Sequence, residues 1–382
     1  MSIDKKYHKK TILQVVPSLV SGGVERGTLE VAKKIVESGK NSIVISAGGP
    51  LVKALEEAGS KHINLNVASK NPFTIWANAK KITNIIREGH IDIIHARSRA
   101  PAWSCYLAAK ETNIPLITTF HGIYNFKSSL KKFYNSIMTR GHKVIAVSNF
   151  VKEHILNNYK IDAKNIEVIH RGVNHKDFAQ ENLPNELLQQ FKEKYKVPIN
   201  TPVILLPSRI ARWKGHMVLI DALERIKHLN FYCIIAGDLS KHPAYIEQIK
   251  TKIHEYKIQN HVHIFANESN MLALYGLADI VLSTSIEPEA FGRTIIEAQS
   301  MEKLIIATNI GGASETIEDG ITGFHVPPGD SNALALKIEH CLSLIGSDAA
   351  RKITGAARKT ISKKFSLDAM LDKTLAIYDE LK

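Results

Sequence analysis

The chain has 382 residues, of which 44% are hydrophobic and 23% charged, a composition that excludes collagenous, coiled-coil and intrinsically disordered proteins. Because one core usually serves roughly 100–200 residues, this length predicts two domains. The net charge of +13 favours an anionic partner, such as nucleic acid, an acidic membrane surface or a phosphorylated substrate.

Short runs rich in valine and isoleucine alternate with longer stretches of helical period, the pattern of βαβ units and parallel sheets. In the first half we expect strands at Ile12–Val16, Ser42–Ser46, Ile91–His95, Leu116–Phe120, Lys143–Val147 and Glu167–Ile169. The pattern restarts with Val203–Leu206, Tyr232–Ala236, Val262–Phe265, Ile280–Ser283 and Leu304–Ala307, and after Phe324–Val326 the rest of the chain has a helical period. The expected fold is therefore α/β, with two Rossmann-like, doubly wound parallel-sheet domains facing a central cleft.

The strand pattern is lost in the middle of the chain, which sets the expected domain boundaries. We expect an N-terminal domain at 1–178, a linker with one polar helix at 179–201, a C-terminal domain at 202–362, and a closing helix at 363–382 that packs back on the first domain. In such sheets ligands bind beyond the carboxyl ends of the strands, so the segments after strands are the candidates for a site.

A candidate binding loop follows the first strand of each half: the loop in the first half contains paired glycines, and the loop in the second half contains two cations. Gly22 and Gly23 open the first long helix, and paired glycines let backbone N–H groups approach a phosphate. Arg209 and Lys214, five residues apart, suit the two phosphoryl groups of a diphosphate. Alternatively, the paired glycines form only a tight turn, and the two cations belong to a solvated basic loop without a ligand.

The segment from Glu287 to Ala298 is the most informative. Its two carboxylates, Glu289 and Glu297, would lie roughly 12 Å apart if the chain between them is helical, too far for a glycosidase-like pair but suited to the ends of an extended ligand. The alternative is that neither glutamate binds a ligand. Glu297 would then be an ordinary exposed helix residue, and Glu289 would be an acidic residue favoured near the start of a helix. His121, after a strand, is a further candidate, although a lone histidine is more often structural.

Several motifs are missing from the sequence. There is no Asp-x-Asp, His-Glu-x-x-His or Gly-x-Ser-x-Gly, and the cysteines Cys105, Cys233 and Cys341 form no Cys-x-x-Cys pair. We therefore expect no metal site and no cofactor. The first ten residues are too polar for a signal peptide, and no apolar run approaches the roughly 18 residues of a membrane span, so a cytoplasmic protein is expected.

Taken together, these segments resemble the GT-B glycosyltransferases of family 4, retaining enzymes that use sugar nucleotides. The resemblance rests on Gly22-Gly23-Val24-Glu25, Thr119-Phe120-His121-Gly122, Arg171-Gly172-Val173-Asn174, Ser208-Arg209 with Lys214-Gly215, Glu289-x7-Glu297, and Gly311-Gly312-x-x-Glu315. Relatives often have Asn-Gly-Val where this chain has Arg171-Gly172-Val173, a departure that concerns the hinge between domains.

The resemblance implies roles for individual residues. Arg209 and Lys214 would hold the diphosphate, with Gly22 and Gly23 completing that site across the cleft. Glu297 would accept the ribose hydroxyls, and Glu289 and His121 would contact the donor sugar. Phe291, Gly292 and Arg293 are assigned to donor binding as well. The donor would be a UDP- or GDP-sugar, with no metal required.

The acceptor is inferred from charge. Residues 1–180 hold 27 lysines and arginines against 13 acidic residues, whereas residues 181–382 hold 23 against 24. Because family 4 enzymes commonly bind the acceptor with the first domain, we expect an anionic or lipid-linked glycan acceptor in envelope polysaccharide, lipopolysaccharide or glycolipid biosynthesis. The protein would then lie peripherally on the inner face of the cell membrane.

Candidate membrane contacts are the basic residues Lys127, Lys131, Lys132, Arg140 and Lys143, among apolar side chains that recur at helical spacing between Tyr124 and Met138. Alternatively, those apolar side chains pack on the sheet as part of the core, and only the lysines are exposed to solvent.

Three other functions compete. A nucleotide-sugar 2-epimerase of the same fold needs no acceptor, which leaves the basic half unexplained. A nucleic-acid-binding protein lacks a supporting aromatic pattern or basic recognition helix, so no nucleic acid is expected. A non-catalytic protein that binds an anionic ligand would not need Arg209, Lys214, Glu289 and Glu297 together.

Overall fold

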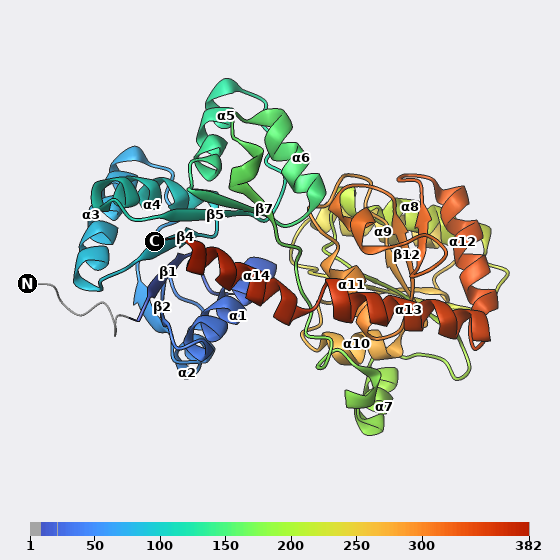
Figure 1. Ribbon diagram of the computed structural model, residues 1–382. Helices are drawn as coiled ribbons and strands as arrows, with labels where there is room; N and C mark the ends of the chain where they lie inside the picture. The colour runs from blue at the N-terminus through green and yellow to red at the C-terminus, as the bar shows by residue number, and fades with distance from the viewer. Residues whose placement is uncertain (1–8, 21, 382) are drawn as a thin grey trace, which may run out of the picture. The chain divides into compact units, whose positions relative to one another are not determined.

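The computed structural model describes residues 9–20 and 22–381, which divide into two compact units, residues 1–170 with 370–382 and residues 171–369 (Figure 1). Each unit contains its own parallel sheet with helices between successive strands, the two-sheet α/β architecture expected from the sequence. The first segment of the first unit ends at His170, whereas the N-terminal domain was expected to end at residue 178.

The first unit is built on a seven-stranded sheet in the order β3-β2-β1-β4-β5-β6-β7. The strands are β1 (Thr11–Val15), β2 (Asn41–Ser46), β3 (Lys61–Asn64), β4 (Ile93–Ala96), β5 (Leu116–Phe120), β6 (Lys143–Ala146) and β7 (Ile166–Val168). The helices are α1 (Gly23–Glu37), α2 (Val52–Glu57), α3 (Pro72–Glu88), α4 (Arg99–Thr112), α5 (Ser129–Asn135) and α6 (Asn149–Asn158), with short 3-10 turns η1 (Ser136–Thr139) and η2 (Ala163–Asn165). Both faces are covered, so β1, β4 and β5 are buried at every residue.

The second unit has a six-stranded sheet in the order β10-β9-β8-β11-β12-β13. The strands are β8 (Val203–Pro207), β9 (Tyr232–Ala236), β10 (Val262–Phe265), β11 (Ile280–Ser283), β12 (Leu304–Thr308) and β13 (Phe324–Val326). The helices are α7 (Asn185–Lys194), α8 (His216–Arg225), α9 (Pro243–Glu255), α10 (Met271–Leu277), α11 (Arg293–Ser300), α12 (Ser331–Leu344) and α13 (Asp348–Lys364), with 3-10 turns η3 (Gln180–Asn182), η4 (Arg212–Lys214) and η5 (Gly312–Thr316). Leucine, isoleucine and valine side chains fill a core on each face.

The segment 179–201, expected to be a linker, is part of the second unit. It contains the expected polar helix, α7, but Phe191 and Tyr195 at its end are buried against the sheet, and Leu183 contacts Gly276 of α10. The loss of strand pattern at 179–201 therefore marks a helical layer of the second unit.

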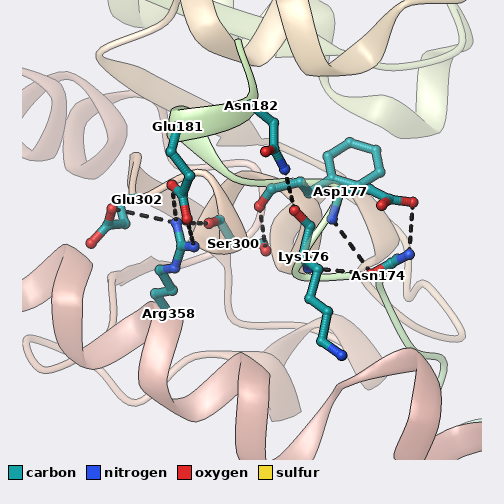
Figure 2. Close-up of polar contacts among 9 residues, drawn as sticks. Asn174, Lys176, Asp177, Glu181, Asn182, Ser300, Glu302 and Arg358 are labelled. Carbon is teal, nitrogen blue, oxygen red and sulfur yellow. Dashed lines mark hydrogen bonds and ion pairs between the residues drawn. The ribbon is translucent and has the colours of Figure 1, made fainter.

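Polar contacts fasten the start of this segment to the rest of the second unit (Figure 2). Arg358 of α13 reaches Glu181 at 2.7 Å and Glu302 at 3.6 Å, and the Ser300 hydroxyl donates to the Phe178 carbonyl at 2.7 Å. Asn182 donates to the Lys176 carbonyl, and Asn174 caps the turn by accepting from the Lys176 N–H at 3.2 Å. The chain is thus held close to the place where it leaves the first unit.

The chain crosses between the units twice, and the two crossing segments pair with each other. Val173 donates its N–H to Phe365 at 3.0 Å and accepts from Leu367 at 2.9 Å. At Gly172 an added Cβ would lie 2.6 Å from the Leu367 Cα, so only glycine allows this approach. The return crossing runs within the last helix, α14 (Leu367–Glu380), whose residues from Met370 group with the first unit.

A buried hydrogen-bond pair fixes α14 in the first unit. The ring of His95 on β4 bonds the Tyr378 hydroxyl at 2.6 Å through one nitrogen and the Thr119 hydroxyl at 2.7 Å through the other. His95 and Tyr378 are both fully buried, and burial holds the pKa of His95 well below its ordinary value. The imidazole is therefore neutral and serves as a structural link between α14 and the sheet.

Replacing Tyr378→Phe should lower the free energy of unfolding by about 1–3 kcal/mol, because it leaves a buried His95 nitrogen without its partner. Urea unfolding measures this change. Tyr256→Phe is the matched control, since that hydroxyl bonds Asp221 near the surface and its loss should cost less than about 0.5 kcal/mol. Equal stabilities of the Tyr378 variant and the parent would contradict the role given to this pair.

Candidate functional site

The candidate residues of the second unit lie where the strand order of its sheet reverses. β9 and β10 extend the sheet on one side of β8, whereas β11, β12 and β13 extend it on the other. The loops that follow β8 and β11 therefore lie beyond the carboxyl ends of two neighbouring strands at this reversal, where such sheets usually have their ligand-binding crevice. Arg209 and Lys214 follow β8, and Glu289 and Glu297 follow β11.

The loops after β8 and β11 are in direct contact. The Thr284 hydroxyl donates to the Lys214 carbonyl at 2.9 Å, and Ile286 donates its N–H to the Trp213 carbonyl at 2.8 Å. Gly215 has φ +72°, and a Cβ there would lie 1.9 Å from the Thr284 carbonyl oxygen. Only glycine fits, which explains Lys214-Gly215 at the end of η4 and fixes the position of the lysine.

Lys214 and Glu289 form an ion pair in the crevice. Their Nζ and Oε1 atoms lie 2.6 Å apart, and the side chains are only 13% and 14% exposed. The Ser285 hydroxyl donates to the same carboxylate oxygen. An ion pair so protected from water attracts more strongly than a surface pair, so both side chains are held in place.

The glycine pair after β12 holds the backbone of Glu289. Gly312 donates its N–H to the Glu289 carbonyl at 2.7 Å, and Gly311 has φ +69°, with a Cβ position 2.6 Å from the same oxygen. The Thr308 hydroxyl donates to the Ser285 carbonyl at 2.7 Å. The Gly311-Gly312 turn therefore positions a candidate catalytic carboxylate.

Glu297 lies inside α11 and is 6% exposed, so the alternative of an exposed helix residue is wrong. Arg293 donates to one carboxylate oxygen at 2.9 Å, and the Tyr275 hydroxyl donates to the other at 3.0 Å. Burial, and secondarily the Glu297 charge, raise the Tyr275 pKa well above its ordinary value, so Tyr275 stays a donor. Each oxygen keeps capacity for a further hydrogen bond.

The remaining predicted residues of this unit surround the two carboxylates. Gly292 precedes α11 and packs on Ile295, and Phe291 is buried with its ring 5.9 Å from that of Phe365. Arg209 is exposed, its guanidinium 5.4 Å from the Trp213 ring centroid, and Lys214 lies 4.4 Å from the same centroid. Trp213 thus holds two cations at one edge of the crevice.

His216, the first residue of α8, is a buried support of this loop. Its ring bonds the Ser208 hydroxyl at 3.2 Å, and burial lowers its pKa to about 4. His216 is therefore neutral at physiological pH and adds no charge to the crevice.

The predicted residues of the first unit lie at its own reversal of strand order, between β1 and β4. Gly22, with φ +135°, precedes α1, and Gly23 begins the helix. The position of a Cβ on Gly22 would lie 2.7 Å from a Glu25 carboxylate oxygen. His121 follows β5, the next strand along.

Three polar residues of these crevices were missed by the sequence reading. Ser285 and Tyr275 bond Glu289 and Glu297, and Arg97, which follows β4, is buried and donates to Gln14 of β1 at 3.2 Å. Arg97 could have been noted as a cation directly after a strand. Tyr275 lies 22 residues before its partner, and no local pattern links the two.

Metal-binding groups and membrane-spanning helices are both absent from residues 9–20 and 22–381, the part of the chain that the structure describes. No group of three or more histidine, cysteine, aspartate or glutamate side chains there could hold a metal ion. In that same part of the chain, no helix is long and apolar enough to cross a membrane.

Comparison with known proteins assigns the chain to a family. Residues 21–177 match the model for Glycosyltransferase Family 4, and residues 189–360 match that for Glycosyl transferases group 1. A crystal structure of a glycosyltransferase from Rickettsia africae ESF-5 is 57% identical, with a TM-score of 0.92 and coverage of 98% of this chain and 99% of that one. An uncharacterized glycosyltransferase of Methanocaldococcus jannaschii is 31% identical over 315 residues, 80% of either chain. The protein therefore belongs to the family 4 glycosyltransferases.

A further solved structure shows the same architecture. Anabaena HepE in complex with UDP-glucose has a TM-score of 0.84 to this chain at 24% identity, covering 97% of this chain and 100% of that one. The two parallel-sheet units form the GT-B fold, and the protein is a glycosyltransferase.

Replacing Gly311→Ala should disturb the site more than an alanine at another left-handed glycine. The new Cβ would meet the Glu289 backbone at 2.6 Å, so Glu289 must shift and lose its alignment with Lys214. Gly320→Ala is the matched control, because Gly320 has φ +73° and no atom within 4 Å of its Cβ position. We expect the control to lose about 1 kcal/mol of stability and the Gly311 variant clearly more, measured by urea unfolding. Equal losses would contradict this role of the turn.

Proposed function

We propose that the protein is a retaining glycosyltransferase that moves a hexose-type sugar from a UDP- or GDP-sugar to a lipid-linked or anionic glycan. The observation that carries the proposal is the pairing of Lys214 with Glu289 at 2.6 Å beside Arg209, at the reversal of strand order. Envelope polysaccharide, lipopolysaccharide or glycolipid biosynthesis is the proposed context. The UDP-glucose bound by Anabaena HepE supports a UDP-sugar as donor.

Each donor group has a proposed partner in the second unit. Arg209 and Lys214 bind the diphosphate, and the fork of Arg209 suits two phosphate oxygens. Glu297 accepts the ribose hydroxyls with the lone pairs that Arg293 and Tyr275 leave open. Glu289 contacts the sugar, and Phe291, Gly292 and Arg293 shape the nucleotide side of the crevice. From the first unit, Gly22 and Gly23 contact the diphosphate and His121 the sugar.

The reaction proposed is a front-face substitution. The acceptor hydroxyl attacks the anomeric carbon on the side from which the nucleoside diphosphate leaves, and its proton passes to the departing phosphate. Negative charge grows on the leaving group, so preorganised cations lower the barrier most where this charge develops. Arg209 and Lys214 supply that stabilisation without a metal ion, and turnover is expected to persist in EDTA.

The proposed acceptor and location rest on charge. Within residues 1–170, lysine and arginine number 25 and aspartate and glutamate number 12. A basic unit attracts phosphorylated or lipid-linked glycans at an anionic leaflet. We therefore propose a cytoplasmic protein that works peripherally on the inner face of the cell membrane.

Replacing Lys214→Ala or Arg209→Ala should reduce kcat/KM for donor turnover by about 100-fold or more, because each removes a charge-assisted bond to the leaving group. UDP- and GDP-sugars are first compared by thermal shift, and turnover is measured with the donor that stabilises the protein most. Lys227→Ala is the control, since Lys227 pairs with Glu224 on the exposed side of α8 and should leave turnover unchanged. Near-parent kcat/KM in both site variants would refute the diphosphate assignment.

The product should keep the α configuration of the donor, because attack and departure share one face of the sugar. NMR of the anomeric proton in the new linkage measures the outcome. A β linkage would contradict the retaining mechanism. Conversion of the sugar nucleotide to its 2-epimer without an acceptor would instead support the epimerase alternative.

A further inference from the structure

Two helices of the first unit expose large apolar side chains. On α3, Phe73 is 85% and Trp76 is 61% exposed, and on α5, Leu130 is 82% and Phe133 is 56% exposed. Single exposed apolar residues are common on soluble proteins, but these four include three aromatic rings on two helices of the same unit. The alternative that the apolar residues of the Tyr124–Met138 segment are all core is wrong for Leu130 and Phe133, although Ile137 is buried.

Helix α4 connects the two exposed groups. The Trp103 ring of α4 lies 5.4 Å from the Phe133 ring, and its indole N–H donates to the Tyr134 carbonyl at 3.2 Å. The next residue, Ser104, donates its hydroxyl to the Ile75 carbonyl at 3.0 Å, directly before Trp76. Both exposed groups are therefore attached to the same helix, α4.

Acidic residues are absent from two long sequence stretches around these side chains, although Glu111, at the edge of one stretch, pairs with Lys80 at 3.4 Å. No aspartate or glutamate occurs between Glu57 and Glu88, which includes the exposed part of α3, or between Glu111 and Glu153, which includes α5. The exposed basic residues in the two stretches are Lys61, Lys70, Lys80, Lys81, Arg87, Lys127, Lys131, Lys132 and Arg140. Lys80 lies 5.7 Å from the Trp76 ring centroid, and Arg140 lies 5.4 Å from that of Phe133.

This combination fits the interface of an anionic bilayer. Tryptophan and phenylalanine partition to the level of the lipid headgroups, and lysines beside them extend to the phosphates. A soluble anionic glycan would match the lysines but would not bury Phe73 and Leu130. Nucleic acid would offer bases for stacking, but the aliphatic Leu130, which is 82% exposed, has no counterpart there.

We propose that the first turns of α3 and helix α5 form a lipid-binding surface, comprising Phe73, Trp76, Leu130 and Phe133 with Lys80, Lys131 and Lys132. The four apolar side chains enter the headgroup region of an anionic leaflet, and the lysines bind lipid phosphates. The role of this lipid-binding surface rests on the proposed function, which it extends by identifying the surface that brings the first unit to a lipid-linked acceptor.

The test is co-sedimentation of the full chain with vesicles of phosphatidylcholine containing phosphatidylglycerol, without donor or acceptor. We expect binding at low salt, release at high salt, and little binding to pure phosphatidylcholine, because screening over roughly 10 Å at 0.1 M weakens attraction to the surface. Phe73→Ser with Trp76→Ser, and separately Leu130→Ser with Phe133→Ser, should each weaken binding about tenfold. Lys131→Glu with Lys132→Glu should weaken it at least as much.

Matched controls lie on the second unit. Ile199→Ser with Leu336→Ser removes apolar side chains that are 91% and 68% exposed, and Lys363→Glu with Lys364→Glu reverses two adjacent exposed lysines. Both controls should bind vesicles like the parent. Equal losses in control and test variants, unchanged binding in either apolar test pair, or a parent that ignores anionic vesicles would overturn the proposal.

Fluorescence quenching locates the surface directly. Bromine-labelled lipids should quench part of the tryptophan emission of the parent protein, and Trp76→Phe should abolish most of that quenching, whereas Trp213→Phe should not. Quenching that Trp76→Phe leaves unchanged would overturn the proposal, as would a dimer in solution that the Phe73 and Trp76 substitutions dissociate. Donor turnover is assayed without vesicles, so failure of the lipid-binding surface and failure of the proposed transfer reaction give separate results.

Discussion

The reversal of strand order between β8 and β11 is the constraint on which the candidate site depends. Lys214 and Glu289 are 75 residues apart, and they meet because β8 and β11 are neighbours and the loops that follow them are in contact. The contact between the loops is so close that Gly215 tolerates no Cβ. The first unit repeats the arrangement, since Gly22 follows β1 and Arg97 follows β4 on either side of its own reversal. Topology thus selects the residues that can act together, and the glycines permit the contact.

The sequence predicted most strands because buried parallel strands are continuous apolar runs. Tyr232–Ala236 and Ile280–Ser283 match the expected bounds, and each strand is buried at every residue. Lys61–Asn64, which forms β3, was missed because it is an edge strand with only one apolar residue. The candidate residues could be chosen in advance for the same reason, since glycines and cations directly after a recognised strand point to the sheet edge where ligands bind.

Features that depend on distant residues could not be read locally. Glu297 can be buried because Tyr275 and Arg293 donate hydrogen bonds to it. The sequence around Glu297 does not show that these two side chains are its partners. The segment 179–201 lost its strand pattern and suggested a linker, yet Tyr195 is 1% exposed and Arg358 binds Glu181 across 177 positions. Such contacts join residues that are far apart in the sequence, so a local sequence pattern does not reveal them. The boundary between the units was therefore expected too late in the chain.

The charges of the second unit's crevice are arranged asymmetrically, and this bears on donor binding. Glu289 already balances Lys214, so the pair presents little net charge while both side chains remain largely buried. Arg209 differs, because among the described residues no carboxylate forms an ion pair with it, and its guanidinium lies 5.4 Å from the Trp213 ring centroid. A diphosphate would therefore meet the full charge of Arg209 first, at an exposed side chain with low desolvation cost. It would then compete with Glu289 for Lys214, and a sugar hydroxyl donating to the released carboxylate would offset that exchange. In this arrangement the binding of the phosphates and the binding of the sugar favour each other.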